Sequence, residues 1–156
     1  MTANITKTVK TRIPVEFAQF VLFDYFGDAS VSDIERPTNS NWVGCAGRGG
    51  AVFHPSDQSI AAHVELELWS DQPSTDDLHD DFARFEGRFT ADSGRVILAS
   101  LTGSPSDVTI ELPAAPVYEV RAIQLGSSVD EEGHQNEAWR LLVWPVSGER
   151  GAHSVA

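Results

Sequence analysis

The stretch Ala61-Ala-His-Val-Glu-Leu-Glu-Leu-Trp69 decides the fold class, because its polar and apolar side chains alternate. In an extended strand the polar set lies on one face: His63, Glu65 and Glu67. The apolar set lies on the other face: Val64, Leu66 and Leu68. A period of two is typical of a strand with one buried face, and helical periodicity is nearly absent from the chain.

Further runs along the chain have the length and composition of strands. They are residues 17–23, 50–53, 83–89, 95–101, 107–112, 117–125 and 138–144. Turn-forming residues stop these runs, as at Ser93-Gly94 and Pro113-Ala-Ala-Pro116. Short strands at this spacing predict an all-β fold, a single-domain antiparallel β-sandwich of about eight or nine strands with at most one short helix. We expect the domain to span residues 5–147, with residues 1–4 and 148–156 frayed.

The balance of charge limits the classes of partner. The chain has 23 acidic and 11 basic residues, which gives a formal net charge of −12. Such a charge repels phosphate backbones and anionic lipid surfaces, so we expect no nucleic-acid partner and no membrane partner. A basic protein partner is permitted, and so is a role in solubility alone.

The chain also indicates its compartment. Cys45 is the single cysteine, so an intrachain disulfide is impossible. The first residues contain no apolar run of signal-peptide length, and no apolar stretch approaches the ~20 residues of a membrane helix. These features predict a cytoplasmic protein.

Two segments are long for hairpin loops, residues 27–41 and 70–81, and long ordered loops often carry function. The second contains Ser74-Thr-Asp-Asp-Leu-His-Asp-Asp81, which holds four aspartates and no basic residue. Ser74 or Thr75 could cap a short helix over about residues 75–82. The candidate partner-binding residues are Asp71, Asp76, Asp77, Asp80 and Asp81.

A metal ion is the first alternative for this acidic stretch. A helix–loop–helix calcium site needs an oxygen ligand at position 3, glycine at position 6 and glutamate at position 12. Counted from Asp76, these positions hold Leu78, Asp81 and Gly87, so the pattern fails. Weak calcium binding, a solvated loop and a docking surface remain as interpretations. We expect no structural metal and no cofactor.

Other chemical motifs are weak. The five histidines form no pair at ligand spacing, and the chain has no G-x-S-x-G elbow. Cys45 precedes the glycine cluster Gly47-Arg-Gly-Gly50, which indicates a tight turn rather than a nucleophile or a phosphate loop. The acidic run 130–137 indicates a polar loop or hairpin tip.

Several pieces, read in order, resemble one family. They are Phe17-Ala-Gln-Phe-Val-Leu-Phe23, Trp42, Gly49-Gly-Ala-Val-Phe53, Leu68-Trp69, Phe85 to Phe89, Gly94-Arg-Val-Ile-Leu-Ala-Ser-Leu101, Asp107-Val-Thr-Ile-Glu-Leu-Pro113 and Tyr118-Glu-Val-Arg-Ala122. Their order is similar to that of the competence protein J family, small bacterial all-β proteins that inhibit the DNA-entry nuclease. The resemblance covers roughly residues 15 to 125 and implies a β fold and a nuclease partner. It implies no contact residues.

Three functions follow as hypotheses. The first is an acidic, non-enzymatic protein-binding module, a nuclease inhibitor or immunity-type protein that docks a basic partner. The second is a small-molecule or saccharide-binding sandwich, hydrolytic in one version, that uses Trp42 or Trp69 with strand glutamates. The candidate glutamates are Glu65, Glu67, Glu86 and Glu119. The third is a self-assembling structural protein. The tryptophans, which include Trp139 and Trp144, are more often core residues than sugar platforms.

Overall fold

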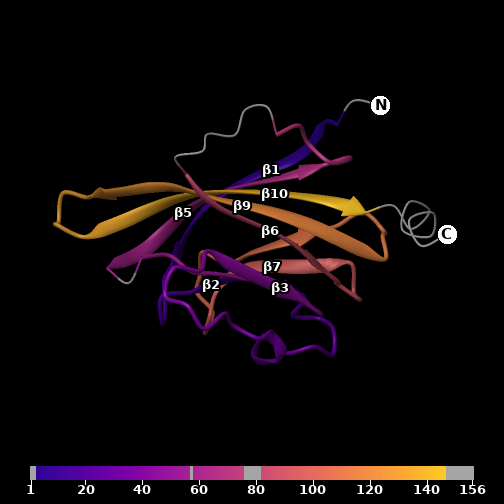
Figure 1. The fold of residues 1–156 in the computed structure, drawn as a ribbon, viewed down its shortest axis with the longest axis horizontal. Helices are drawn as coiled ribbons and strands as arrows, with labels where there is room; N and C mark the ends of the chain where they lie inside the picture. The colour runs from indigo at the N-terminus through magenta and orange to yellow at the C-terminus, as the bar shows by residue number, and fades with distance from the viewer. Residues whose placement is uncertain (1–2, 57, 76–81, 147–156) are drawn as a thin grey trace.

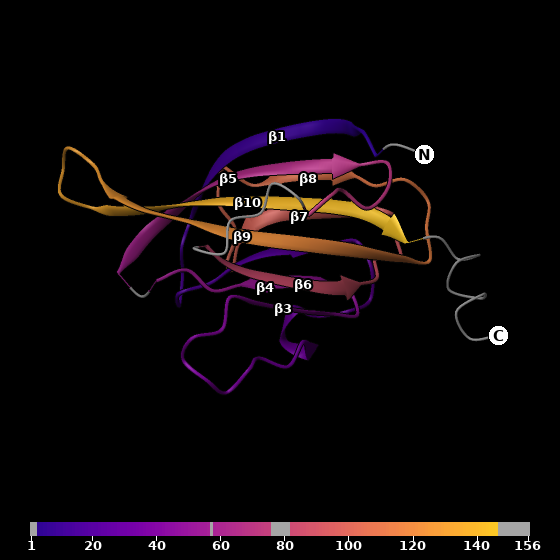
Figure 2. The ribbon, with the colours of Figure 1, turned by 45° about the horizontal axis from the view of Figure 1, so that its top comes forward.

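The computed structural model describes residues 3–56, 58–75 and 82–146 as two five-stranded sheets that pack face to face. The first sheet has the order β1-β5-β10-β9-β6, and the second has the order β3-β4-β2-β7-β8. The two layers are seen in Figures 1 and 2. The first sheet contains β1 (Ile5–Pro14), β5 (Ser59–Trp69), β6 (Ala83–Phe89), β9 (Val117–Val129) and β10 (Gln135–Val146). The second contains β2 (Phe20–Phe23), β3 (Gly44–Gly47), β4 (Gly50–Phe53), β7 (Arg95–Ser100) and β8 (Val108–Glu111).

The prediction of an all-β sandwich is confirmed, with ten strands in the described residues rather than eight or nine. The two strands that the sequence did not reveal are β1 and β3. In β1 the apolar residues Ile5, Val9 and Ile13 recur at every fourth position, which hides the alternation, and most of the strand is exposed. In β3 the sequence is Gly-Cys-Ala-Gly, which carries no strand signal of its own.

One pair of strands corrects the expectation of a wholly antiparallel sandwich. β10 pairs with β5 in parallel, from Asn136 opposite Ala61 to Val143 opposite Leu68. The other pairs of named strands are antiparallel. The reason is topological: the β9–β10 hairpin inserts β10 between β5 and β9, and the direction of insertion is not encoded in the residues of either strand.

The core lies between the two sheets and is filled largely by aromatic and branched side chains. Val64, Leu66 and Leu68 face it, as the alternation in β5 predicts. Trp139 of β10 contacts two phenylalanines of the opposite sheet, Phe20 at 5.2 Å and Phe53 at 6.0 Å between ring centres. These rings join the two layers at the centre of the molecule.

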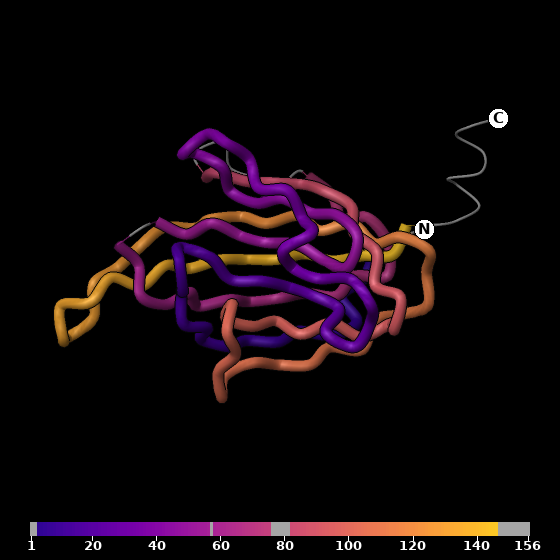
Figure 3. Tube along the Cα trace, turned by 90° about the horizontal axis from the view of Figure 1, so that it is seen from below, coloured from indigo at the N-terminus to yellow at the C-terminus, as the bar shows by residue number. Residues whose placement is uncertain are grey.

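The β9–β10 hairpin is longer than the strands beside it and projects beyond the sandwich (Figures 1 and 3). Its tip closes through two backbone hydrogen bonds, from the Asp130 N–H to the His134 carbonyl (2.9 Å) and from the Gly133 N–H to the Asp130 carbonyl (3.0 Å). The Asp130 carboxylate accepts the N–H groups of His134 and Glu132, and the bond from His134 contributes most to lowering the Asp130 pKa. The first part of the acidic run, residues 130–134, is therefore a hairpin tip, as predicted, whereas residues 135–137 belong to β10.

The chain between β2 and β3 covers part of the outer face of the second sheet. It contains the one 3-10 helix of the described residues, η1 (Val31–Asp33), and Ile34, which is buried with Val52 and Ala99. The short helix expected over residues 75–82 falls mostly on residues 76–81, which lie outside the described part of the chain.

Asp24 fixes the start of this covering segment, although its side chain is only 1% exposed. Its carboxylate accepts hydrogen bonds from the Ser93 hydroxyl (2.6 Å), the Ser93 N–H (3.0 Å) and the Phe26 N–H (3.1 Å). Burial alone would raise the pKa of Asp24, but these hydrogen bonds to its ionised form outweigh burial and hold the pKa below its ordinary value.

A strained turn precedes β2. The backbone of Glu16 and Gln19 pairs across two residues, Phe17 (φ 53°) and Ala18 (φ 56°), that both adopt left-handed conformations. Bulky residues rarely occupy this region, because their side chains crowd the backbone. The Phe17 side chain is nevertheless 79% exposed, so no burial of its ring compensates for the strain.

The first prediction concerns Asp24. We expect Asp24→Asn to lower the free energy of unfolding by about 1–3 kcal/mol at about pH 7, because hydrogen bonds to a buried carboxylate weaken. Since the native pKa is lowered, the stabilisation is complete above the ordinary carboxyl pKa of about 3.9 and is lost as the pH falls through the native pKa.

Urea unfolding of wild type and variant at about pH 7 and at about pH 3 measures the difference. Asp28→Asn, at an exposed position of the same segment, is the control. A difference between wild type and Asp24→Asn that grows on acidification would contradict the assignment.

Candidate functional site

The acidic stretch lies in the connection between β5 and β6, which we call the β5–β6 connection (residues 70–82). β5 and β6 run in the same direction and are separated by β10 and β9. A chain that links two parallel strands must return along the sheet over one of its faces. The inner face is filled by the core, and the connection contacts the outer face at Ser74 and Phe82.

A small apolar cluster on this outer face anchors both ends of the connection. Ile123, Leu142 and Trp144 are its buried members. Trp69, at the end of β5, and Phe82, just before β6, pack against them. The two aromatic rings therefore hold the chain to the sheet just before the connection and at its last residue.

Arg121 of β9 adds a polar anchor beside this cluster, and its side chain is fully buried. Its Nε lies 2.8 Å from a carboxylate oxygen of Glu86, and its Nη1 donates to the Ser74 carbonyl at 3.2 Å. Its guanidinium carbon lies 5.2 Å from the centre of the Trp144 ring. Burial of an arginine is stable only with such partners, so Arg121 fixes the backbone of the connection at Ser74.

Glu67 forms a second ion pair on the same face and is only 5% exposed. It accepts hydrogen bonds from the Arg140 guanidinium at 2.9 and 3.2 Å and from the Trp69 indole N–H at 3.0 Å. The other three strand glutamates also face a basic residue of a neighbouring strand. The pairs are Glu65 with Lys10, Glu86 with Arg121 and Glu119 with Arg88.

These pairs bear on the saccharide-binding hypothesis. A hydrolytic site needs two carboxylates that face one open cleft, whereas the strand glutamates are engaged with cations across the sheet. Trp42 lines a separate hollow of about 440 Å³ and stacks on His54 at 4.5 Å. Among its described lining residues none of the four glutamates is present. Trp139 and Trp144 are buried, as expected for core residues.

The structure places the predicted partner-binding residues unevenly. Asp71 is the second residue of the β5–β6 connection, is half-buried and accepts the Gln72 N–H at 2.8 Å. Asp76, Asp77, Asp80 and Asp81 lie outside the described residues. The structure thus shows how the connection is anchored to the sheet, whereas partner binding by these aspartates stays a prediction.

Cys45 lies in β3 and is buried, next to the turn that leads into β4. Burial raises the pKa of its thiol against a smaller opposing effect of Arg36, so the reactive thiolate is disfavoured. Gly50 follows in a site where a Cβ atom would lie 2.2 Å from the Leu22 carbonyl oxygen. The interpretation of the glycine cluster as a tight turn is confirmed, and the structure shows that this turn joins β3 to β4.

Two further findings concern the described residues alone. No group of three or more histidine, cysteine or acidic side chains there is placed to hold a metal ion. No helix in that part of the chain is long and apolar enough to cross a membrane.

A second surface feature was not found by sequence reasoning. The outer face of the second sheet contains a hollow of about 470 Å³, here called the β2–β7 hollow. Its described lining comes from β2, β7, the start of the segment 24–43 and the loop 101–107. Val31, in the long segment 27–41, forms part of its wall, and the length of that segment was a feature of the sequence that could have indicated a site. No sequence pattern indicated Tyr25 or Asp107.

Comparison with known proteins gives a likeness in structure. No protein-family model and no curated protein matches the sequence. ComJ of Bacillus subtilis, an inhibitor of the DNA-degrading activity of NucA, superimposes with a TM-score of 0.59 at 12% identity, over 94% of this chain and 100% of ComJ. The product of crocagin biosynthetic gene J superimposes with a TM-score of 0.51 at 10% identity, over 93% of this chain and 99% of that one. The resemblance to competence protein J is confirmed at the level of the fold.

The second prediction tests the Arg121 anchor. We expect Arg121→Met to lower the free energy of unfolding by about 2 kcal/mol, because the buried guanidinium loses its pair with the partly exposed Glu86 and its bond to the Ser74 carbonyl together. Arg88→Met is the matched control, since Arg88 forms the same kind of pair with Glu119 but is 63% exposed. Its cost should stay below about 1 kcal/mol. Urea unfolding measures the free energy of unfolding of both variants. Equal losses of stability would contradict the role of Arg121 as an anchor of the connection.

Proposed function

We propose that the protein is a cytoplasmic, non-enzymatic inhibitor that binds a basic protein partner, and that this partner is a nuclease. One observation carries the proposal: nearly the whole chain adopts the fold of ComJ, an inhibitor of the DNA-degrading activity of NucA. The likeness extends over all of ComJ, so it is not a fragment of sandwich shared by chance between larger proteins.

The net charge of −12 supports a basic partner. A nuclease holds the phosphates of its substrate in a positively charged cleft. An acidic protein is attracted to that cleft by the same field, and opposite potentials speed the encounter. An inhibitor that occupies the cleft would therefore exclude DNA without any chemistry of its own.

We assign the contact to the β5–β6 connection, through Asp71, Asp76, Asp77, Asp80 and Asp81. The anchoring of its ends supports this choice. Trp69 and Phe82 pack on the sheet, and Ser74 is bonded to Arg121. A segment that is held at its ends loses less conformational entropy on binding than a free loop of the same length.

The third prediction concerns these aspartates. Replacement of Asp76, Asp77, Asp80 and Asp81 by asparagine should change the free energy of unfolding by less than about 0.5 kcal/mol, because surface substitutions rarely cost more. The same variant should lose capture of a basic protein from lysate of the native host. Wild type should capture it at about 0.05 M salt and release it at about 0.5 M salt, where exposed charges are screened.

The captured protein is then assayed for degradation of double-stranded DNA with and without added wild-type protein. The control variant removes an equal number of charges elsewhere, at Glu35, Glu111, Glu131 and Glu132, which are all exposed. The proposal requires inhibition by wild type and by the control variant and loss of inhibition by the aspartate variant. If the captured protein degrades DNA at the same rate with and without the wild-type protein, the proposed inhibitor function is wrong.

A further inference from the structure

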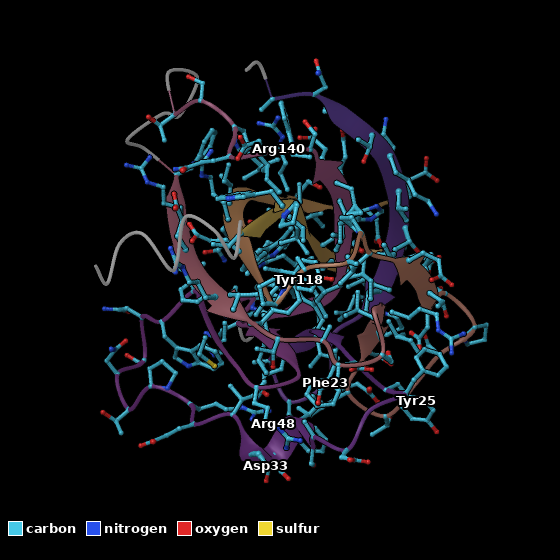
Figure 4. All side chains as sticks on the ribbon, turned by 90° about the vertical axis from the view of Figure 1, so that its right-hand side faces the viewer. Phe23, Tyr25, Asp33, Arg48, Tyr118 and Arg140 are labelled. Carbon is cyan, nitrogen blue, oxygen red and sulfur yellow. The ribbon has the colours of Figure 1, made fainter. Side chains whose placement is uncertain are left out.

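The β2–β7 hollow lies on the face of the sandwich opposite the β5–β6 connection. In Figure 4 Phe23 lies below the centre and Tyr25 at the lower right, whereas Arg140, of the first sheet, lies in the upper part of the view. The floor of the hollow is formed by outward-facing residues of adjacent strands, Val21 and Phe23 of β2 with Ile97 and Ala99 of β7. Its volume of about 470 Å³ falls within the range of ligand pockets, roughly 300–1,000 Å³.

The wall above this apolar floor contains a carboxylate, that of Asp107. Asp107 accepts the Ser100 N–H (3.2 Å) and the Ser104 hydroxyl (2.9 Å) on one oxygen, and the Ser104 N–H (2.9 Å) on the other. These bonds fix its orientation and leave acceptor capacity on the second oxygen. No basic side chain of the described residues forms an ion pair with it.

Two aromatic residues are exposed near the hollow. Tyr25, 75% exposed, contributes to its lining. The strained turn that carries Phe17 lies beside the rim, because Glu16 accepts the N–H of Thr102 (2.9 Å), another lining residue. Exposed aromatic residues are the typical anchors of protein interfaces. A turn that keeps its strain while it presents a phenylalanine to solvent is consistent with selection for contact with another protein.

From these features we infer that the β2–β7 hollow receives one arginine or lysine side chain of a protein partner. The aliphatic stem would lie on Val21, Ile97 and Ala99, and the cationic head would reach Asp107. The Tyr25 ring adds a face on which a cation can rest.

Other occupants fit less well. An anion would be repelled by Asp107, and a purely apolar group would bury that carboxylate without a countercharge. Because the protein carries a net charge of −12, a basic side chain is also the group that the whole molecule attracts. The inference rests on the proposed binding of a basic protein and adds a second contact to it.

The test uses N-acetyl-L-arginine amide as the probe and N-acetyl-L-citrulline amide as its neutral isostere. Each is titrated into the ¹⁵N-labelled full chain, and amide chemical shifts are followed. We expect saturable shifts for the arginine probe at Ile97, Ala99, Ser100 and Ser104, with a dissociation constant on the order of millimolar. The citrulline probe should bind at least threefold more weakly, since one exposed or half-exposed ion pair is worth about that factor.

Two variants separate charge from shape. Asp107→Asn removes the countercharge and should weaken binding of the arginine probe roughly three- to fivefold. Ala99→Leu leaves Asp107 in place and fills the floor, so it should abolish saturable binding. Glu111→Gln, at an exposed position of β8, is the control and should bind as wild type does. Amide spectra of each variant confirm the fold before titration.

The outcomes distinguish this inference from the proposed function. Shifts spread over acidic residues throughout the surface, or binding equal for arginine and citrulline, would overturn the hollow as a site while leaving nuclease inhibition untouched. Conversely, absence of a nuclease partner combined with saturable, Asp107-dependent arginine binding would remove the inhibitor function and keep the site. Full inhibition of a captured nuclease by Asp107→Asn and Ala99→Leu would also remove the hollow from that interface.

Discussion

The parallel pairing of β5 with β10 is the constraint on which the rest of the structure depends. With β10 and β9 between β5 and β6, the chain after Trp69 can reach Ala83 only by returning over a face of the first sheet. That return needs an outer face that is partly apolar. Ile123, Leu142 and Trp144 supply it, so the first sheet is buried on both faces along its centre. If β5 and β10 were antiparallel, the chain could pass from β5 to β6 at one end of the sheet without crossing its face.

A sheet that is covered on both faces must also satisfy the polar groups it buries, and two Glu-x-Trp pairs do so. Residues two apart on a strand share a face. Glu67 accordingly accepts the indole N–H of Trp69, and Glu137 that of Trp139. Glu137, 2% exposed, accepts three more hydrogen bonds, from Gln124 (2.6 Å), the Ser56 N–H (2.9 Å) and the Ser59 hydroxyl (3.1 Å). Each indole thus finds its acceptor locally, and Glu137 joins the base of the long hairpin to the chain before β5.

The alternation in residues 61–69 predicted both the strand and its buried face, because a period of two is a local property of the sequence. The partner of that strand and its direction were not predictable, because alternation is typical of antiparallel sheets, whereas the parallel neighbour β10 is brought there by a hairpin far along the chain. Arg121 could have been identified from the sequence as a residue that needs partners. It lies within the largely apolar first part of the strand Val117–Val129, and a buried arginine requires hydrogen-bond acceptors such as a carboxylate nearby. Asp107 and Tyr25 meet at the hollow through loop geometry alone, which no residue pattern encodes.

The two proposed contacts lie on opposite outer faces, and their physics differs accordingly. A standard interface covers about 800 Å² of each partner, which is a patch on one side of a small domain. In the proposed complex, charge on the β5–β6 connection would act over roughly one Debye length, about 8 Å at physiological salt, and would guide approach before contact. The β2–β7 hollow acts only within van der Waals range, where Asp107 distinguishes a basic side chain from a neutral one of similar shape. β3 and β6 contact each other across the two sheets and form one edge of the sandwich. To reach both faces, a single rigid partner would have to extend around this edge. Because the two proposed contacts use different elements of the fold, attraction by the connection and selection by the hollow should be separable by substitution.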